Sequence, residues 1–518
     1  MRSCVVSLVA LSLALPGEAA ASYAFYVGNK LTADGSVLVG GTGEEVSSHW
    51  LAIVPQEHHR RGATIKVGVT GAATIPGVLT SIPQVPLTRR YIAMRYTDYK
   101  GFPPPLTNGG LNEHQVAIRD VWSPSRAELV AMTPRPQRGP NYSDLARIAL
   151  QRARTAREAV TLIGRLIERY GYSTYGGNSH LIADPTEGWV LIAFAGGQRL
   201  WVAERLGPRD IRVCYPGYVR PVPQDFRRRR DFMGSANLIS FATERGWFRP
   251  APGKKLDVYK VYGLGRGTAR APGLKYVDPR QLEQELRRKA PRVTVKDLMT
   301  AVRDPRISDE EAGYGQVAHL RRGVPGDLAL LWVAPTGSVT SPFVPYRVGV
   351  EEVLPEYRQH RYLTKGSATS FLDPDFQSQE GTLFAGRLFK RLLYHTCAHP
   401  KKFLPEVTEA LEAFESRALA EQPTVEQTAL ALRRQGRADL ARRYLTEHSR
   451  CKAREALELG EALLGSIEAR TRLLYGIRRP RGATINSRGG PTPNCLVGAD
   501  PDRPPADRNR GKDPPPKP

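Results

Sequence analysis

The most informative absences in this sequence are the motifs of metal, nucleotide and triad-type hydrolase chemistry. The 518 residues contain no HExxH metal motif, no GxxxxGKS/T phosphate loop, no dinucleotide fingerprint and no GxSxG nucleophile elbow. Only ten histidines occur, and one adjacent pair, His58-His59, stands in a polar stretch beside Arg60-Arg61. An isolated histidine pair of this kind is typical of a solvated loop, so we expect neither a metal nor an organic cofactor.

Cysteine and long apolar runs are also scarce. Of the five cysteines, Cys4 lies in the N-terminal leader, and the other four are far apart without metal-ligand spacing. One or two disulfides are compatible with an exported protein, and the first pairing that we expect joins Cys397 to Cys451. No internal stretch reaches the roughly 18 apolar residues needed to cross a bilayer, so no membrane span is expected.

Acidic residues are fewer than basic ones. Lysine and arginine total 75 against 51 aspartates and glutamates, which gives a net charge of +24. Such an excess fits either nucleic-acid binding or an arginine-rich composition spread over solvated faces. The basic residues are dispersed and no RNA- or DNA-binding motif accompanies them, so we favour the second interpretation and expect no nucleic-acid partner. The sequence does not indicate an oligomeric state.

Residues 1–21 have the pattern of an export signal. Arg2 is followed by a short apolar core at Val5–Leu15, a break at Pro16-Gly17, and the small-residue cleavage signature Ala19–Ala21. Cleavage after Ala21 would make Ser22 the first residue of a secreted or periplasmic protein.

The rest of the chain divides by its pattern of apolar residues into three parts. Residues 22–360 are mainly strand-like with helical inserts, residues 361–477 are helical, and residues 478–518 form a tail rich in proline and arginine that we expect to be disordered. Strands are predicted at Tyr23–Val27 and Ser36–Val39 around an Asp34-Gly35 turn, in a meander at His180–Ala183, Trp189–Phe194 and Leu200–Arg205, and at Leu328–Val333. Helices are predicted at Ser143–Tyr170, with a capping box at Thr155 and Glu158, and at Thr294–Val302 and Gly381–Thr396. The segment Leu404–Ile477 is predicted to form two or three long helices with breaks at Gln422-Pro423 and Gly436. Thr424 and Gln427 form a capping box where the helix restarts after the first break.

Ser22 is the residue whose position suggests chemistry. An N-terminal serine carries its own general base, because its hydroxyl can attack a carbonyl while the free α-amine, with an ordinary pKa near 7.7–8.0, takes the proton. Such a site needs a processing step that leaves serine, threonine or cysteine at the start of a strand. Ser22 meets these conditions, although a polar residue after a cleavage site is also common.

Several motifs resemble peptidase family C69, a family of dipeptidases. Ser22–Ser36 is similar to the family's opening segment, in which a nucleophilic cysteine precedes a glycine, a lysine and an Asp-Gly-Ser turn. Asn108–Ala117 resembles its Gly-Met-Asn-Glu-x-Gly-Val-Ala motif, and Gly177–Ile192 its Ile-Ala-Asp-Pro-x-Glu-x-Trp strand pair. The segment from Leu331 to Tyr357 resembles its closing motifs, so the likeness covers most of residues 22–357 in the family's order.

The resemblance implies a fold and a set of roles. It implies an α+β fold, the αββα sandwich of N-terminal-nucleophile hydrolases, in which two antiparallel sheets lie between helical layers. It implies Ser22 as the nucleophile, Asn112 as the oxyanion donor, and Glu44 or Asp34 as the group that orients the amine or holds the substrate's ammonium. Asn112 and Asp34 also suit turns, from their sequence context alone.

The chain departs from the family's pattern at three places. Serine stands at position 22 where the family has cysteine, Gly41–Glu44 stands where the family has Arg-Asn-Glu-Asp, and Pro216-Gly217 stands near the position of an Asn-Gln pair. An arginine beside the nucleophile and a second oxyanion donor are therefore missing from their expected places. Three hypotheses follow: an exported dipeptidase acting through an acyl-enzyme, an amidohydrolase or acylase acting on a non-peptide amide, and a binding protein of the same fold without catalysis.

Overall fold

The computed structural model describes residues 22–44, 49–96, 100–263, 277–308, 312–358 and 385–476. The expected signal segment and the expected disordered tail lie outside these residues, as does the boundary at residue 360 between the strand-rich and helical parts.

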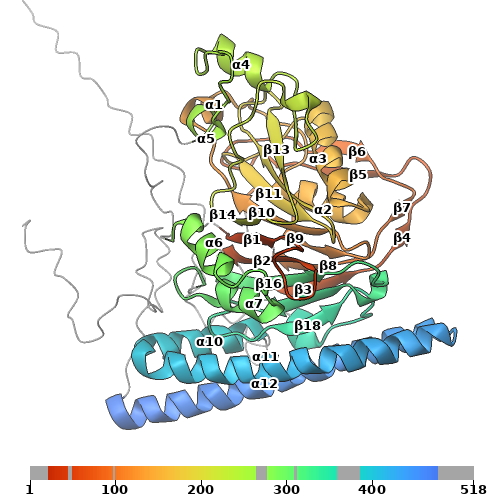
Figure 1. Ribbon diagram of the computed structural model, residues 1–518, viewed down its shortest axis with the longest axis vertical. Coiled ribbons are helices and arrows are strands. Elements are labelled where there is room, and N and C mark those ends of the chain that lie inside the picture. The colour runs from red at the N-terminus through yellow and green to blue at the C-terminus, as the bar shows by residue number, and fades with distance from the viewer. Residues whose placement is uncertain are drawn as a thin grey trace, which may run out of the picture.

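Two antiparallel sheets form the body of the molecule (Figure 1). The six-stranded sheet has the order β14-β1-β2-β16-β17-β18, and the eight-stranded sheet has the order β15-β13-β12-β11-β10-β9-β8-β3. The strands of the first are β1 (Ala24–Val27), β2 (Val37–Glu44), β14 (Ile211–Cys214), β16 (Ala312–Leu320), β17 (Leu330–Ala334) and β18 (Val344–Arg347). Those of the second are β3 (Trp50–Val54), β8 (Tyr91–Tyr96), β9 (Leu106–Asn112), β10 (Ala117–Trp122), β11 (Asn178–Ala183), β12 (Gly188–Ala193), β13 (Trp201–Leu206) and β15 (Phe232–Gly234).

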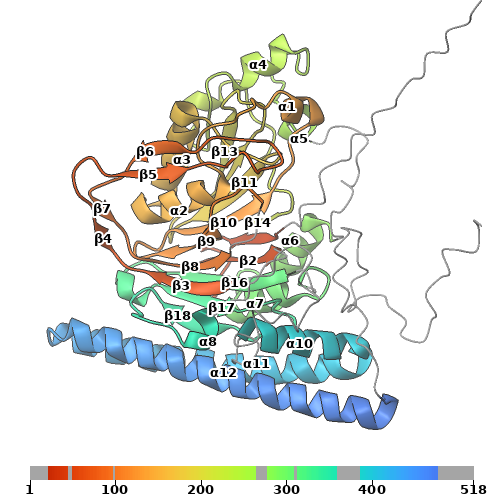
Figure 2. The same ribbon diagram turned by 180° about the vertical axis from the view of Figure 1, so that it is seen from behind.

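Two small ribbons extend from the side of the body (Figure 2). They pair β4 (Glu57–His58) with β7 (Leu87–Thr88) and β5 (Thr64–Val67) with β6 (Thr80–Pro83). His58 is exposed, and the His59 ring hydrogen-bonds Thr88 Oγ1 at 3.0 Å. The histidine pair is therefore part of a surface ribbon, as its polar context suggests.

Alternation along the strands builds three apolar layers. On β1, Ala24 and Tyr26 face the eight-stranded sheet, whereas Tyr23, Phe25 and Val27 belong to a second cluster on the outer face. That outer face is covered by α6 (Pro279–Arg287) and α7 (Val295–Arg303), and the outer face of the eight-stranded sheet by α2 (Tyr142–Arg152) and α3 (Ala156–Tyr170). The molecule thus has two sheets face to face, each backed by helices.

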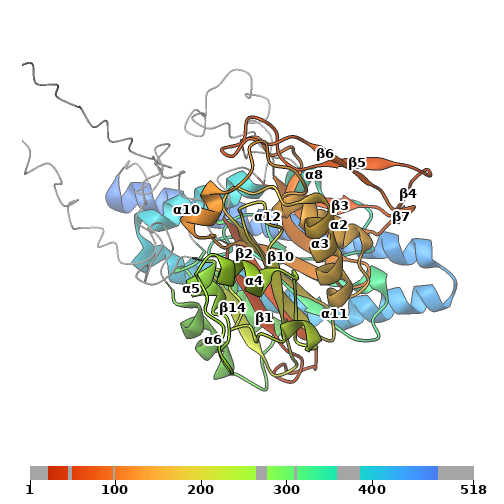
Figure 3. The ribbon, with the colours of Figure 1, turned by 90° about the horizontal axis from the view of Figure 1, so that it is seen from above.

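Short elements complete the strand-rich part. They are α1 (Ala127–Ala131), α4 (Leu238–Glu244), α5 (Val258–Val261), α8 (Pro355–Arg358) and the 3-10 turns Phe226–Arg228 and Gly326–Leu328. From above, α4 and α5 lie on the side of the body away from the β5 and β6 ribbon (Figure 3).

Three C-terminal helices lie beneath the six-stranded sheet (Figures 1 and 2). They are α10 (Ala385–Ala398), α11 (Pro400–Arg434) and α12 (Ala438–Tyr475), and α11 and α12 both contact β18. A buried ion pair joins α11 to α7: Arg303 Nη1 lies 2.9 Å from Glu415 Oε2, and Glu415 Oε1 accepts from the Phe343 N–H at 2.8 Å. The helices therefore share a polar core contact with the strand-rich part.

Most of the predicted elements are present. β1 and β2 form an antiparallel hairpin around the Asp34-Gly35 turn, in which Gly35 has φ +74°, a value that suits glycine. The meander pairs β11, β12 and β13 in order. The helical insert is two helices rather than one. Thr155 caps the second by accepting from the Glu158 N–H at 3.1 Å, but the predicted capping box is wrong, because Glu158 Oε2 accepts from the Arg154 N–H and not from that of Thr155. Thr294 caps α7 with a full capping box.

The predicted break at Gln422-Pro423 is wrong, and so is the restart at Thr424, because α11 runs continuously from Pro400 to Arg434. Pro423 is exposed, so the backbone carbonyl one turn earlier, which receives no hydrogen bond from proline, lies near solvent. In the same turn, the Gln422 side chain donates to the Ala418 carbonyl at 2.6 Å. The break at Gly436 is confirmed, since α11 ends before it and α12 begins at Ala438.

The expected pairing of Cys397 with Cys451 is also wrong. Cys451 is a free, exposed thiol on α12, whereas Cys397 is disulfide-bonded. Cys214 is free and buried in β14, and burial raises the pKa of its thiol to about 12. Cys214 is therefore a packing residue.

Candidate active site

Ser22 lies at the start of β1, where the chain enters the space between the two sheets. Its side chain is buried, with an exposed fraction of 5%. Strand alternation gives it the same face as Ala24, toward the eight-stranded sheet. Tyr23 anchors the strand start, because its N–H donates to Thr42 Oγ1 at 3.1 Å and its carbonyl accepts from the Thr42 N–H at 3.0 Å.

Two glycines in β2 let neighbouring residues pack closely against the backbone beside Ser22. Gly41 pairs with Ala24, and the same register continued by two residues sets Gly43 beside Ser22. A Cβ atom at Gly43 would collide with the Tyr314 ring, and one at Gly41 would collide with the Tyr23 carbonyl oxygen. The glycines thus allow side chains from other strands to approach the backbone next to Ser22.

Arg119 occupies the volume over Gly41. Its side chain comes from β10, in the opposite sheet, and is 2% exposed. Nη1 donates to the Tyr314 hydroxyl at 2.9 Å and to Gln316 Oε1 at 2.8 Å, and Nη2 donates to the Thr42 carbonyl at 2.5 Å. The guanidinium therefore connects the two sheets. It does so at the level of Ala24 and Gly41, the residue pair next to Ser22 on this face of the sheet.

Tyr314 connects Arg119 to a second set of buried polar groups. The Tyr314 hydroxyl donates to Asn108 Oδ1 at 3.1 Å, and Asn178 Nδ2 donates to Asp120 Oδ2 at 2.9 Å. Burial raises the pKa of Asp120 to about 6, although the amides of Asn178 and Asn108 and the charge of Arg119 act in the opposite direction. We call the set Thr42, Asn108, Arg119, Tyr314 and Gln316 the inter-sheet polar cluster, which Asp120 adjoins through Asn108.

His49 and Tyr96 line the cluster on the Tyr314 side. The His49 ring centroid is 5.1 Å from that of Tyr314 and 5.3 Å from that of Tyr96, and the histidine is buried. The Tyr96 and Tyr142 hydroxyls are hydrogen-bonded to each other, which continues the aromatic wall toward α2. Aromatic rings thus border the polar groups near Ser22.

Asn112 lies on the other face of its strand. Its Nδ2 donates to the carbonyls of Leu150 and Ala153, at 3.0 and 2.8 Å, and its Oδ1 accepts from the N–H groups of His114 and Val116. Both amide hydrogens are therefore used at the C-terminal end of α2, so the structure does not bring Asn112 to Ser22. These bonds suit the turn role, because they close the connection between β9 and β10.

The two acidic candidates differ in position. Glu44 ends β2 directly after Gly43, and its side chain lies outside the described part of the structure. Asp34 is in the turn at the far end of β1 from Ser22, where its Oδ1 accepts from the Ser36 N–H at 3.1 Å and its Oδ2 bonds the His319 ring at 2.6 Å. These bonds hold the pKa of Asp34 well below its usual range. The turn role of Asp34 is confirmed.

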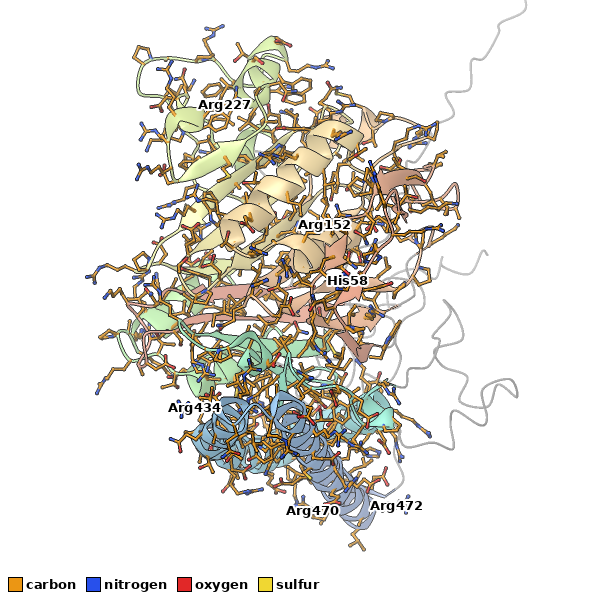
Figure 4. The ribbon with its side chains drawn as sticks, turned by 90° about the vertical axis from the view of Figure 1, so that its right-hand side faces the viewer. His58, Arg152, Arg227, Arg434, Arg470 and Arg472 are labelled. Carbon is orange, nitrogen blue, oxygen red and sulfur yellow. The ribbon has the colours of Figure 1, made fainter. Side chains whose placement is uncertain are left out.

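A second surface feature lies away from Ser22. A groove between α8 and α12, lined by residues such as Glu356, Arg450 and Glu461, contains no serine, cysteine or histidine. No cluster of potential metal ligands occurs within the described ranges. Arginines are dispersed over the surface, from Arg227 near one end to Arg434, Arg470 and Arg472 on the long helices at the other (Figure 4). No helix in this part of the chain is both long enough and apolar enough to span a membrane.

Sequence reasoning missed Arg119 and Tyr314. The one signal available for Arg119 was the Arg119-Asp120 pair inside a short strand whose other residues, Ala117, Ile118 and Val121, are apolar, because charged side chains there need buried partners. Tyr314 stands in a Gly-Tyr-Gly sequence that resembles a loop, and only the pairing of β16 with β2 brings it to Gly43.

Comparison with known proteins identifies relatives over this same region. The model of the family described as peptidase family C69 matches residues 21–297. A probable dipeptidase from Salmonella dublin is 26% identical over 261 residues, which cover 49% of this chain and 55% of that protein. Probable dipeptidase A of Streptococcus pyogenes serotype M3 is 24% identical over 221 residues, or 42% of this chain and 44% of the relative. Probable dipeptidase B of the same serotype is 22% identical over 451 residues, or 77% of this chain and 83% of the relative. The chain thus spans about half the length of the first two relatives.

Proposed function

Since the chain belongs to peptidase family C69, we propose that it is a dipeptidase that hydrolyses small peptide bonds with Ser22 as an N-terminal nucleophile. The observation that carries the proposal is the position of Ser22. It stands at the start of a central strand, next to Gly43, and directly behind the small-residue signature Ala19–Ala21. Removal of residues 1–21 would give its amine to the site, and the fold would then be that of an N-terminal-nucleophile hydrolase.

The reaction would follow acyl transfer. The Ser22 oxygen attacks the carbonyl carbon of the peptide bond while the Ser22 amine takes the hydroxyl proton. The amine then gives that proton to the leaving nitrogen, the C–N bond breaks, and the second residue departs with a neutral amino group. Water attacks the carbonyl carbon of the resulting ester while the amine takes a proton from it. The bond between that carbon and the Ser22 oxygen then breaks, the amine returns the proton to this oxygen, and the first residue leaves as a carboxylic acid.

The surrounding residues support this chemistry to different degrees. Glu44, at the end of β2, is proposed to orient the Ser22 amine or the substrate's ammonium group. Asn112 has both amide hydrogens engaged at α2, so we do not carry its oxyanion role into the proposal. The Tyr314 hydroxyl, in the row of Gly43, accepts from Arg119 and donates its single proton to Asn108 Oδ1, so the proposal assigns no side chain as the oxyanion donor. Serine is a weaker nucleophile than the family's cysteine, which makes the chain dependent on its base.

Export is part of the proposal, because an amine on Ser22 requires cleavage of the leader. We propose a secreted or periplasmic location, supported by the charged start, apolar core and small-residue signature of residues 1–21. N-terminal sequencing of the mature protein tests this step, with Ser22 as the expected first residue. A mature protein that begins earlier would deprive the serine of its amine.

The decisive experiment compares Ser22→Ala and Ser22→Cys with the wild type on a panel of dipeptides and acyl-amides. Alanine should abolish nearly all turnover without changing the fold, and cysteine should retain turnover. Ser240→Ala, at an exposed serine on α4, is the matched control and should behave as wild type. Turnover that survives in Ser22→Ala would refute the nucleophile. Activity restricted to acyl-amides would favour the acylase alternative, and dipeptide binding without turnover in the mature wild type would favour the non-catalytic alternative.

A further inference from the structure

Arg119 is a buried cation whose hydrogen bonds all go to uncharged oxygens. Its acceptors are the Tyr314 hydroxyl, Gln316 Oε1 and the Thr42 carbonyl. Asp120, the next residue, points to the other face of β10, where it bonds Asn178. Within the described ranges no carboxylate lies at ion-pair distance from Arg119. Burying a charge without an opposite charge is costly, so such a group is expected where a ligand supplies the missing charge.

The guanidinium retains donors for such a ligand. Arginine has five N–H groups, and the three bonds above leave the Nε–H and one Nη2–H unused. Nε has no hydrogen-bond partner despite being buried. It lies close to the backbone of Gly41, Tyr23 and Ala24, since a Cβ added at Gly41 would be 3.2 Å from Nε and would collide with the Tyr23 carbonyl oxygen. The unused donors are therefore directed at the strand that Ser22 begins.

We propose that Arg119 is a specificity residue that binds the free carboxylate of the substrate's C-terminal residue. The proposal rests on the dipeptidase function proposed for Ser22. A substrate carboxylate is a permanent charge, so it would neutralise Arg119 throughout the bound state, and a paired hydrogen bond between guanidinium and carboxylate is both strong and directional. A transient oxyanion would compensate the cation only during the reaction.

The proposed role of Arg119 would also limit the length of the substrate. Below it, the row formed by Tyr26, Val39 and Ala318 is part of the apolar core between the sheets. A peptide that enters at Ser22 and continues inward therefore meets the guanidinium before it meets the core. One residue beyond the scissile bond ends there, with its carboxylate at the arginine.

The test uses alanyl-alanine and its C-terminal amide as paired substrates for the full-length mature protein. Wild type should prefer the free acid, by kcat/KM, about thirtyfold or more, the loss expected when one partner of a buried charge pair is removed. Arg119→Gln should raise KM for the acid far more than KM for the amide, and should thereby lose this preference. Arg119→Lys, which keeps the charge but not the paired donors, should restore part of the preference.

Two controls separate the possible failures. Arg347→Gln changes another buried arginine, one whose Nη2 lies 3.5 Å from Glu426, and should leave the acid-to-amide ratio unchanged even if stability falls. Calorimetric binding of both compounds to Ser22→Ala tests Arg119 without requiring turnover. An equal loss of acid and amide activity in Arg119→Gln, or equal binding of both compounds to Ser22→Ala, would overturn the carboxylate role. Loss of the nucleophile alone would leave this binding difference intact.

Discussion

Replacing Glu415 with glutamine should destabilise the protein strongly, because it removes the negative charge beside a guanidinium that has no access to water. The side chains of Arg303 and Glu415 are 5% and 1% exposed. Arg303 donates from both Nη atoms to the carboxylate and from Nε to the Ser338 carbonyl at 2.9 Å. Breaking a buried pair from one side costs about 3–5 kcal/mol. That is a large part of the roughly 5–15 kcal/mol by which a protein of this kind is stable.

The measurement is urea unfolding followed by tryptophan fluorescence. Glu415→Gln should lower the midpoint without a large change in the slope. The double variant Arg303→Met with Glu415→Leu should lie closer to the wild type than the single variant does, because an apolar pair needs no compensating charge. Arg391→Gln is the surface control, since Arg391 and Glu468 are 45% and 22% exposed, and it should cost under about 1 kcal/mol.

A loss below about 1 kcal/mol in Glu415→Gln would refute the reasoning, because the carboxylate would then not be compensating a buried charge. The shape of the transition carries a second result. Arg303 belongs to α7 and Glu415 to α11, so a single transition in the wild type would indicate that the C-terminal helices fold together with the sheets.

Three further changes have defined outcomes. Gly41→Ala inserts a methyl group against the Tyr23 carbonyl, so it should lower the free energy of unfolding by about 1–3 kcal/mol and abolish most of the turnover. Gly71→Ala is the control, because Gly71 has open space around it. A fully active Gly41→Ala protein would contradict the close contact between Gly41 and Tyr23. His180 is fully buried and its pKa is lowered to about 4, so the folded state binds this proton only at a lower pH than the unfolded state does. The contribution of neutral His180 to stability is therefore complete above about pH 6.5 and is lost as the pH falls toward 4. Between pH 6.5 and pH 4, the unfolding free energy of the wild type should fall by about 3 kcal/mol relative to that of His180→Gln. A difference between the two proteins that does not change with pH would refute the assignment. Pro423→Ala should stabilise α11 by up to about 3 kcal/mol in thermal or urea unfolding, because it restores an N–H in the helix interior, and an unchanged midpoint would show that Pro423 costs nothing.

The elements that sequence predicts well are those whose signal is local. The Asp34-Gly35 turn, the meander and the cap at Thr294 each depend on residues a few positions apart. The error at Pro423 has the opposite origin. A proline normally ends a helix, but here the buried face of α11, which includes Val425 and Ala429, continues the packing on its far side.

The site was predictable only where it is contiguous. Ser22 could be found from the leader and the strand that follows it, and Asp34 from its turn. Asn112 was assigned by resemblance to a role that its hydrogen bonds at α2 do not support. Arg119 and Tyr314 come from strands about 100 and 300 residues away from the nucleophile, so no spacing in the sequence connects them to it.

Gly41 and Arg119 compete for the same space, and this has a consequence for how related sequences are compared. A long side chain on β2 at position 41 would need the volume that the β10 guanidinium now fills. Relatives should therefore vary at the two positions in tandem, with arginine on one strand accompanied by a small residue on the other. A search for contiguous catalytic motifs would find no arginine beside Ser22 in this sequence, whereas the fold brings Arg119 against Gly41 from the opposite sheet.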